Sequence, residues 1–99
     1  HVSMGATAVL HTVQALENVE TIVGIELLAA AQGVDYRMAQ IGASPNDLGE
    51  GTRVAYKLFR EKIPRMNTDV YLAPIIEQAR EIVHSAVIKL AVEKQLGMP

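Results

Sequence analysis

Three glutamates, Glu17, Glu20 and Glu26, are the residues best placed to do chemistry, because they interrupt an otherwise apolar stretch. A carboxylate buried among apolar side chains is costly unless a cation or a hydrogen-bond donor accompanies it. Such a group is either a perturbed acid or base, or a partner in ion pairs and hydrogen bonds between helices of an assembly. We favour the interhelical role, since structural networks also perturb carboxylates.

A metal site or an activated nucleophile is not predicted. The only imidazoles belong to His1, His11 and His84, and no two of them have the i, i+4 spacing that places two ligands on one helix face. The sequence has no cysteine, so thiolate ligands and disulfides are excluded. Ser3 has no histidine and aspartate in any triad order. His84 is predicted on the wet face of the last helix.

An anion site is considered at two places. Glycines in Gly49-Glu50-Gly51-Thr52 could let backbone N–H groups approach a phosphate, but no strand precedes them, no lysine follows and Glu50 would repel the anion. We therefore predict a turn and a helix cap there. The basic residues of the following segment are predicted to form a solvated helix surface, because glutamates interleave them; they are Arg53, Lys57, Arg60, Lys62 and Arg65.

One long helix must position the glutamates, and it is predicted over Ser3 to Gln32. The stretch contains no proline, and only Gly5 and Gly24 weaken it. About 30 helical residues span about 45 Å, whereas a chain of this size should form a globule about 26 Å across. The helix should therefore protrude from the rest of the chain.

The second half of this helix is apolar nearly all round, which is typical of a helix buried in a large protein or in a membrane. The glutamates leave no uncharged stretch as long as the 18 to 20 residues, roughly, of a membrane span. The rest of this 99-residue chain can hardly supply the burial. We expect an obligate oligomer or a piece of a larger chain, and the start at His1 rather than Met favours a preceding segment.

The shorter elements follow after a break. The pattern relaxes from Gly33, where we expect the long helix to fray, and Gly42 to Gly51 concentrates turn formers. A second helix is predicted from Gly49 or Thr52 to Ile63, because Pro64 excludes the helical conformation of the residue before it.

One last helix is predicted from Pro74 to the Gly97 region. Its apolar residues are spaced by three and four and form a single stripe: Ile75, Ile76, Ala79, Ile82, Val83, Ala86, Val87, Leu90 and Ala91. No segment alternates like a strand. The predicted fold is all-α, with one long helix and two or three shorter amphipathic helices, in a single segment over residues 1–99.

The composition of the sequence limits the kinds of partner that this chain can bind. The sequence is 49% hydrophobic and 20% charged, which excludes a disordered chain. A formal net charge of −2 gives no electrostatic reason to bind nucleic acid or an anionic membrane. The absence of cysteine fits a reducing cytoplasm.

Several strings resemble the C-terminal part of the histidine ammonia-lyase family, the aromatic amino acid lyases and mutases. The resemblance covers the whole chain in order, through these strings: His1-Val2-Ser3-Met4-Gly5, Glu17-Asn18-Val19-Glu20, Ile25-Glu26-Leu27-Leu28-Ala29-Ala30-Ala31-Gln32, Asp35-Tyr36-Arg37, Leu48-Gly49-Glu50-Gly51-Thr52-Arg53 and Tyr71-Leu72-Ala73-Pro74-Ile75-Ile76-Glu77.

The resemblance implies a homotetramer whose long helices pack in a central bundle, with Glu20 and Glu26 of the assembly helix as interhelical partners. It implies elimination of ammonia from an aromatic amino acid, histidine first, or tyrosine or phenylalanine, by a lyase or an aminomutase. The family's electrophile is a methylidene-imidazolone group, formed from an internal Ala-Ser-Gly and assisted by a catalytic tyrosine.

This chain lacks those catalytic parts. The nearest string to Ala-Ser-Gly is Ala43-Ser44-Pro45, so we expect the group in another part of the enzyme and no activity from these 99 residues alone. In the family, a site-lining Gln or Glu precedes the first string. His1, Val2, Ser3, Met4 and Gly5 are thus expected at the border of an active site. The expected partners are the remaining lyase chain and identical subunits. The alternative is a free-standing helical interaction module without catalysis.

Overall fold

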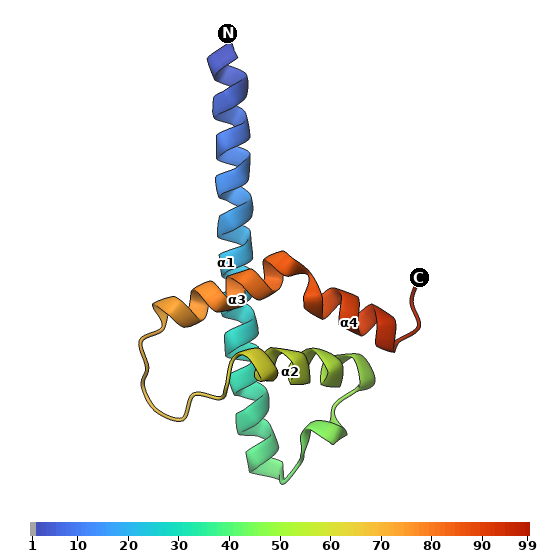
Figure 1. The fold of residues 1–99 in the computed structure, drawn as a ribbon. Helices are drawn as coiled ribbons and strands as arrows, with labels where there is room; N and C mark the ends of the chain where they lie inside the picture. The colour runs from blue at the N-terminus through green and yellow to red at the C-terminus, as the bar shows by residue number, and fades with distance from the viewer. Residues whose placement is uncertain (1) are drawn as a thin grey trace.

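A computed structural model describes residues 2–99, with side chains from Met4 onward, and it is all-α as predicted. The elements are α1 (Val2–Ile41), a 3-10 turn η1 (Pro45–Asp47), α2 (Glu50–Lys62), α3 (Ala73–Ser85) and α4 (Val87–Gln95). Within residues 2–99 there is no strand. The described residues form one long helix with three shorter ones, which is within the prediction of two or three shorter helices (Figure 1).

The helix α1 is longer than predicted. It does not fray at Gly33 but continues to Ile41, because Gln32 and Asp35 are held by side chains and backbone that lie far along the sequence. Gly42 then ends the helix in the left-handed conformation, with φ 67°, and the Ala43 N–H donates to the Met38 carbonyl at 2.9 Å. This pattern is the glycine C-terminal motif of helices.

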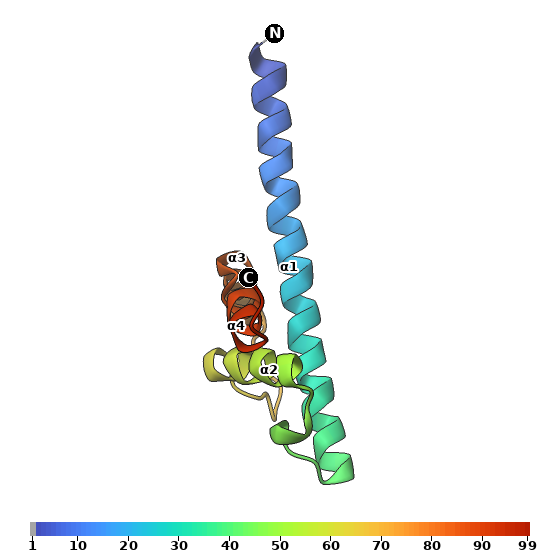
Figure 2. The ribbon, with the colours of Figure 1, turned by 90° about the vertical axis from the view of Figure 1, so that its right-hand side faces the viewer.

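The protrusion of α1 is confirmed. The molecule extends 62 Å along its longest axis and only 17 Å along its shortest. The first half of α1 stands clear of every other element, while its second half is covered by α2 and α3 on one side (Figures 1 and 2).

The predicted last helix is wrong as a single element. It breaks at Ala86, which has φ 60° and ψ 17°, so that α3 and α4 run in different directions. A left-handed residue with a side chain costs about 1–2 kcal/mol. The break turns α4 onto α2, where Val92 Cγ1 and Leu96 Cδ1 would lie 3.4 and 3.5 Å from a Cβ placed on Gly51. We attribute the bend to this packing, which a straight helix could not reach.

A small core joins the second half of α1 to α2 and α3. Its buried apolar residues are Leu28, Ala31, Phe59, Ile63, Ala79 and Ile82, and partly buried side chains from α1, α3, α4 and the loop after α2 surround them. The second helix matches its prediction, since it runs over Glu50–Lys62 and stops before Pro64.

The crossing of α1 and α3 is close, and Gly24 permits it. A Cβ at Gly24 would lie 3.0 Å from the Arg80 backbone nitrogen and 3.2 Å from Ala79 Cβ. Gly24, which looked like a weak point of the long helix, is therefore the contact that lets α3 pack directly on α1.

Candidate functional site

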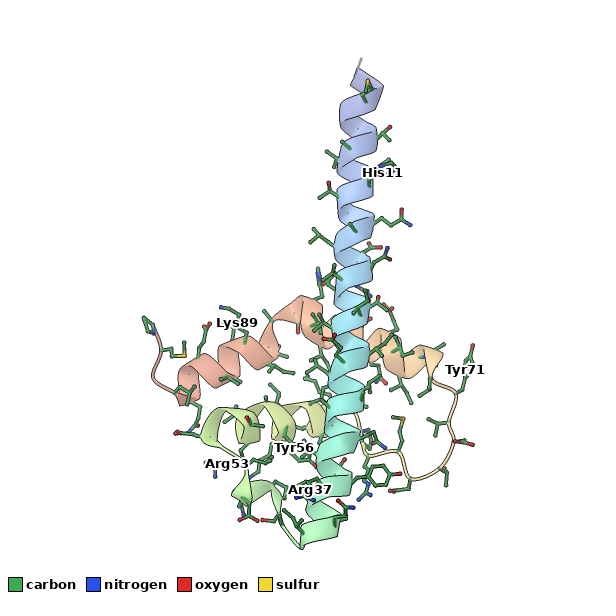
Figure 3. The ribbon with its side chains drawn as sticks, turned by 180° about the vertical axis from the view of Figure 1, so that it is seen from behind. His11, Arg37, Arg53, Tyr56, Tyr71 and Lys89 are labelled. Atoms are coloured by element: carbon green, nitrogen blue, oxygen red, sulfur yellow. The ribbon has the colours of Figure 1, made fainter. Side chains whose placement is uncertain are left out.

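Four of the five predicted border residues, Val2 to Gly5, lie at the start of α1. His1 and the side chains of Val2 and Ser3 fall outside the part of the chain that the structure describes. Met4 and Gly5 lie in the first turns of the helix, and Met4 is 77% exposed. A hollow beside them is lined by Met4, Thr7, Ala8 and His11, and His11 projects from a part of α1 that no other element covers (Figure 3). Their place at an active-site border stays a prediction.

The free part of α1 is an uncovered apolar surface. Large apolar side chains with between 47% and 77% exposure follow one another along it: Met4, Val9, Leu10, Val13, Leu16 and Val19. A contiguous apolar patch on a soluble protein usually marks an interaction site. Among residues 2–99, no helix combines the length and the hydropathy needed to cross a membrane.

A buried polar cluster fixes the second half of α1 to α2. The Asp35 carboxylate is 5% exposed, and its Oδ2 lies 2.6 Å from Arg60 Nη2. The Tyr56 hydroxyl donates a hydrogen bond to Asp35 Oδ1. Tyr56 points from α2 toward α1 (Figure 3). We call Asp35, Tyr56, Arg60 and Gln32 the Asp35 cluster.

Gln32 extends this cluster to the loop that leaves α2. Its Oε1 accepts from Arg60 Nη2 at 2.9 Å and from the Met66 N–H at 3.3 Å, and its Nε2 donates to the Met66 carbonyl at 3.1 Å. Arg60 Nη1 also donates to the Ile63 carbonyl at 3.2 Å. One arginine thus joins a carboxylate, an amide and the helix end, while its buried Nε has no partner.

The Asp35 cluster stabilises the fold and holds no activated acid or base. Burial raises the pKa of the Tyr56 phenol above its ordinary value of 10.0, and the hydrogen bond and charge of Asp35 act in the same direction, while Arg60 opposes them. A phenol with a raised pKa keeps its proton and remains a donor near neutral pH. Tyr56 is therefore a hydrogen-bond donor to Asp35 and not a base.

Sequence reasoning missed this cluster. It placed Arg60 on the solvated basic surface, and this is wrong for Arg60, whose side chain is only 11% exposed. The other cationic residues of that surface behave as predicted: Lys57 and Lys62 are exposed, and Arg53 and Lys57 reach Asn46 at 3.4 and 3.3 Å. A usable signal was the i, i+4 spacing of Tyr56 and Arg60, next to the core residue Phe59.

Glu20 is held by α3. Its Oε2 lies 2.6 Å from His84 Nδ1, and its Oε1 lies 3.8 Å from Arg80 Nη1. Arg80 also makes a two-point contact with Glu77, which lowers the pKa of Glu77 and raises that of Arg80. Glu20 thus forms an interhelical ion pair within one chain. Its predicted part in assembly is a separate matter and stays a prediction.

Glu26 is different. Its side chain is exposed, and it has no hydrogen bond or ion pair with any residue that the structure describes. His84 is exposed as predicted, at 72%, although it reaches Glu20. Within residues 2–99, no group of three His, Cys, Asp or Glu side chains could hold a metal ion.

The two loop motifs have local roles. Gly49 is the N-cap of α2, and its carbonyl accepts from the Arg53 N–H at 2.8 Å, so the turn-and-cap prediction is confirmed. Ala43-Ser44-Pro45 leads into η1, where the Ser44 N–H donates to Asp47 Oδ2 at 2.8 Å. Because the nitrogen of Pro45 carries no hydrogen, this string does not fit the formation of a methylidene-imidazolone group.

Comparison with known sequences identifies the family of this chain. The family model described as aromatic amino acid lyase matches residues 1–61. The chain belongs to the aromatic amino acid lyase family. Histidine ammonia-lyase of Natranaerobius thermophilus is 38% identical over 97 residues, which are 98% of this chain and 18% of that protein.

Two further relatives of this lyase-family chain have the same name. Histidine ammonia-lyase of Symbiobacterium thermophilum is 39% identical over 97 residues, which are 98% of this chain and 18% of that protein. Histidine ammonia-lyase of Chloroflexus aurantiacus is 41% identical over 91 residues, 92% of this chain and 17% of that protein. The chain therefore spans less than a fifth of the length of these relatives. No solved structure matches it.

Proposed function

We propose that this chain is the C-terminal helical part of an ammonia-lyase that converts histidine to urocanate and ammonia. One observation carries the proposal: relatives that cover 92% or more of this chain are histidine ammonia-lyases. The rest of the enzyme, which supplies the methylidene-imidazolone group and the catalytic tyrosine, lies outside these residues. We place the enzyme in the cytoplasm.

The part played by this chain is assembly and the shaping of a site border. The exposed apolar part of α1 supports the assembly role, because a helix with such a surface is stable in water only when other helices cover it. Identical subunits in a homotetramer and the remaining lyase chain are the proposed partners. We assign no catalytic residue to residues 1–99.

Complementation tests the function. The 99-residue chain is mixed with the rest of a parent lyase that has been truncated before its equivalent segment, and urocanate formation from histidine is followed. We expect no urocanate from either part alone and measurable urocanate from the mixture. Urocanate from the isolated chain, or a truncated lyase that is fully active without it, would overturn the proposal. Parallel assays with tyrosine and phenylalanine identify the amino acid.

The second candidate is a free-standing helical interaction module, which the same exposed surface of α1 favours. It predicts a well-folded multimer that forms from the isolated chain and does not change the activity of any lyase part. The complementation assay therefore separates the two candidates, since only the first gains activity on mixing.

A further inference from the structure

Ala86, the junction between α3 and α4, has a backbone conformation that its side chain disfavours. Its φ of 60° lies in the left-handed region, which glycine adopts far more readily than alanine. The helical hydrogen bonds are interrupted as well, because the Ala86 N–H donates to the carbonyl of Val83, only three residues back, at 3.2 Å. The two helices leave this point in different directions (Figure 1). The bend is therefore kept by contacts that α4 makes elsewhere.

The sequence offers a straight alternative without this strain. The apolar stripe of α3 continues across Ala86 with spacings of three and four, through Val87, Leu90 and Ala91. We call these three residues the Leu90 face. Residues 75–96 contain neither glycine nor proline, so nothing local ends the helix. A single helix over α3 and α4 would complete the hydrogen bonds at the break and place the Leu90 face in line with the stripe of α3.

A second apolar face at the end of the chain packs in the bent form. It consists of Ile88, Val92 and Leu96, which are spaced by four residues and lie about a third of a turn from the Leu90 face. We call these residues the Val92 face. Ile88 packs against the core, while Val92 and Leu96 lie beside Gly51 of α2. Leu90 stays 58% exposed in this arrangement. The segment thus has one apolar face for each of the two arrangements.

The attachment of α4 to α2 is weak. None of the residues Val87–Gln95, all of which the structure describes, is buried. The hydrogen bond from Gln95 Nε2 to Glu50 Oε1, at 3.1 Å, joins two exposed side chains. By contrast, the 2.6 Å ion pair of Lys89 with Glu93 lies within α4 at i, i+4 spacing, so it supports this helix whether or not α2 is near. These contacts allow α4 to leave α2 as an intact helix.

We propose that α4 is a flap hinged at Ala86, which exchanges between the bent form on α2 and a straight form continuous with α3. The bent form covers the Val92 face but strains Ala86 and leaves Leu90 in water. The straight form relieves the strain but exposes the Val92 face and the surface of α2 around Gly51. Each form gains what the other loses, which keeps the difference in free energy between them small. The inference does not depend on the proposed function.

A distance between α3 and α4 distinguishes the two forms. The chain has no cysteine, so Gln78→Cys and Lys94→Cys, both at exposed positions, allow two spin labels to be attached selectively. In a straight helix these positions are about 24 Å apart along the axis, and the bend brings them closer. We expect pulsed electron paramagnetic resonance of the labelled chain to show a major short distance and a minor long one.

Three variants shift the balance in opposite directions. Ala86→Gly removes the cost of the left-handed conformation and should lower the ratio of straight to bent forms at least about fivefold. Ala86→Ile has a β-branched side chain, for which this conformation is a genuine outlier, and should make the long distance the major one. Gly51→Leu should also favour the long distance, because Val92 and Leu96 already lie 3.4 and 3.5 Å from its Cβ position.

Gly33→Leu is the matched control, because it lies on α1 and a Cβ there meets nothing within 4 Å. It should leave both distances and their proportions unchanged. Circular dichroism should show the wild-type helix content in every variant, since the flap moves as a helix. A single short distance in the wild type, Ala86→Ile and Gly51→Leu alike overturns the proposal. A loss of helix content with a broad distance distribution also overturns it, because α4 then unfolds instead of straightening.

Discussion

At the scale of single residues, the buried pair of Asp35 and Arg60 joins α1 to α2 with a contact of 2.6 Å. Removing one partner of a buried ion pair costs about 3–5 kcal/mol, because the other charge remains buried without compensation. Arg60→Met should therefore lower the free energy of unfolding by about that amount, measured by urea unfolding and circular dichroism. Little change would mean that water reaches Asp35 in solution.

Two variants serve as controls for that measurement. Arg53→Met removes a partly exposed cation whose contact with the Asn46 carbonyl is 3.4 Å, and it should change the free energy of unfolding by less than about 0.5 kcal/mol. The double variant Asp35→Leu with Arg60→Met removes both charges. It should be more stable than Arg60→Met alone, since no buried charge is left unpaired.

Tyr56 gives the same cluster a pH signature. Its pKa is raised in the folded chain, so the folded state holds the phenolic proton more tightly than the unfolded state. The resulting stability is complete below pH 10.0, the ordinary pKa, and is lost as the pH rises through the higher folded pKa. Tyr56→Phe should cost about 1–2 kcal/mol near neutral pH. It should also lose less stability than the wild type above pH 10.0, in urea unfolding curves recorded at several pH values.

At the scale of elements, two glycines of α1 should respond in opposite directions to the same change. Alanine favours a helix by about 1 kcal/mol over glycine. At Gly33 a Cβ meets nothing within 4 Å, so Gly33→Ala should raise the melting temperature. At Gly24 the Cβ would lie 3.0 Å from the Arg80 nitrogen, and overpacking of that kind costs about 1–3 kcal/mol. Gly24→Ala should therefore lower the melting temperature, and a rise at both positions would contradict the close crossing.

The bend between α3 and α4 makes a further prediction. Ala86 has φ 60°, a conformation that glycine adopts without steric cost. Ala86→Gly should stabilise the chain by about 1 kcal/mol, measured as a rise in the melting temperature. Ala79→Gly, in the regular part of α3, is the contrasting control and should destabilise it. Equal destabilisation by both substitutions would indicate a continuous helix in solution.

The sequence predicted elements wherever local signals were strong. Proline and glycine marked the ends of α2, and the apolar run of α1 indicated a long helix that protrudes from the rest of the chain. The end of α1 was missed because Asp35 is fixed by Arg60, 25 residues further along the chain, and no local pattern reports such a partner. The break at Ala86 was missed for a similar reason: the local sequence contains no glycine or proline, and only the contact between α4 and α2 explains it.

At the scale of the whole molecule, the chain divides into a packed half and an uncovered half. The second half of α1 has α2, α3 and a small core beside it, whereas the first half has nothing (Figure 1). The ion pairs follow the same division, since Glu20 meets α3 at the upper edge of the packed half. A chain built in this way holds one end of a long helix firmly and presents the other end to a partner.

This division separates the roles of Glu20 and Glu26. Glu20 contacts Arg80 and His84 within the chain, so Glu20→Ala should lower the free energy of unfolding of the isolated chain, by less than about 1 kcal/mol because these groups are partly exposed. Glu26 is exposed with no contact among the described residues, so Glu26→Ala should leave that free energy unchanged within about 0.5 kcal/mol.

If the proposed assembly is correct, however, Glu26 gains an interhelical partner in the complete lyase, and Glu26→Ala should weaken the assembled enzyme on dilution. Urea unfolding of the isolated chain and native mass spectrometry of the complete enzyme measure the two effects. An enzyme with Glu26→Ala that stays assembled at every concentration tested would remove Glu26 from the assembly.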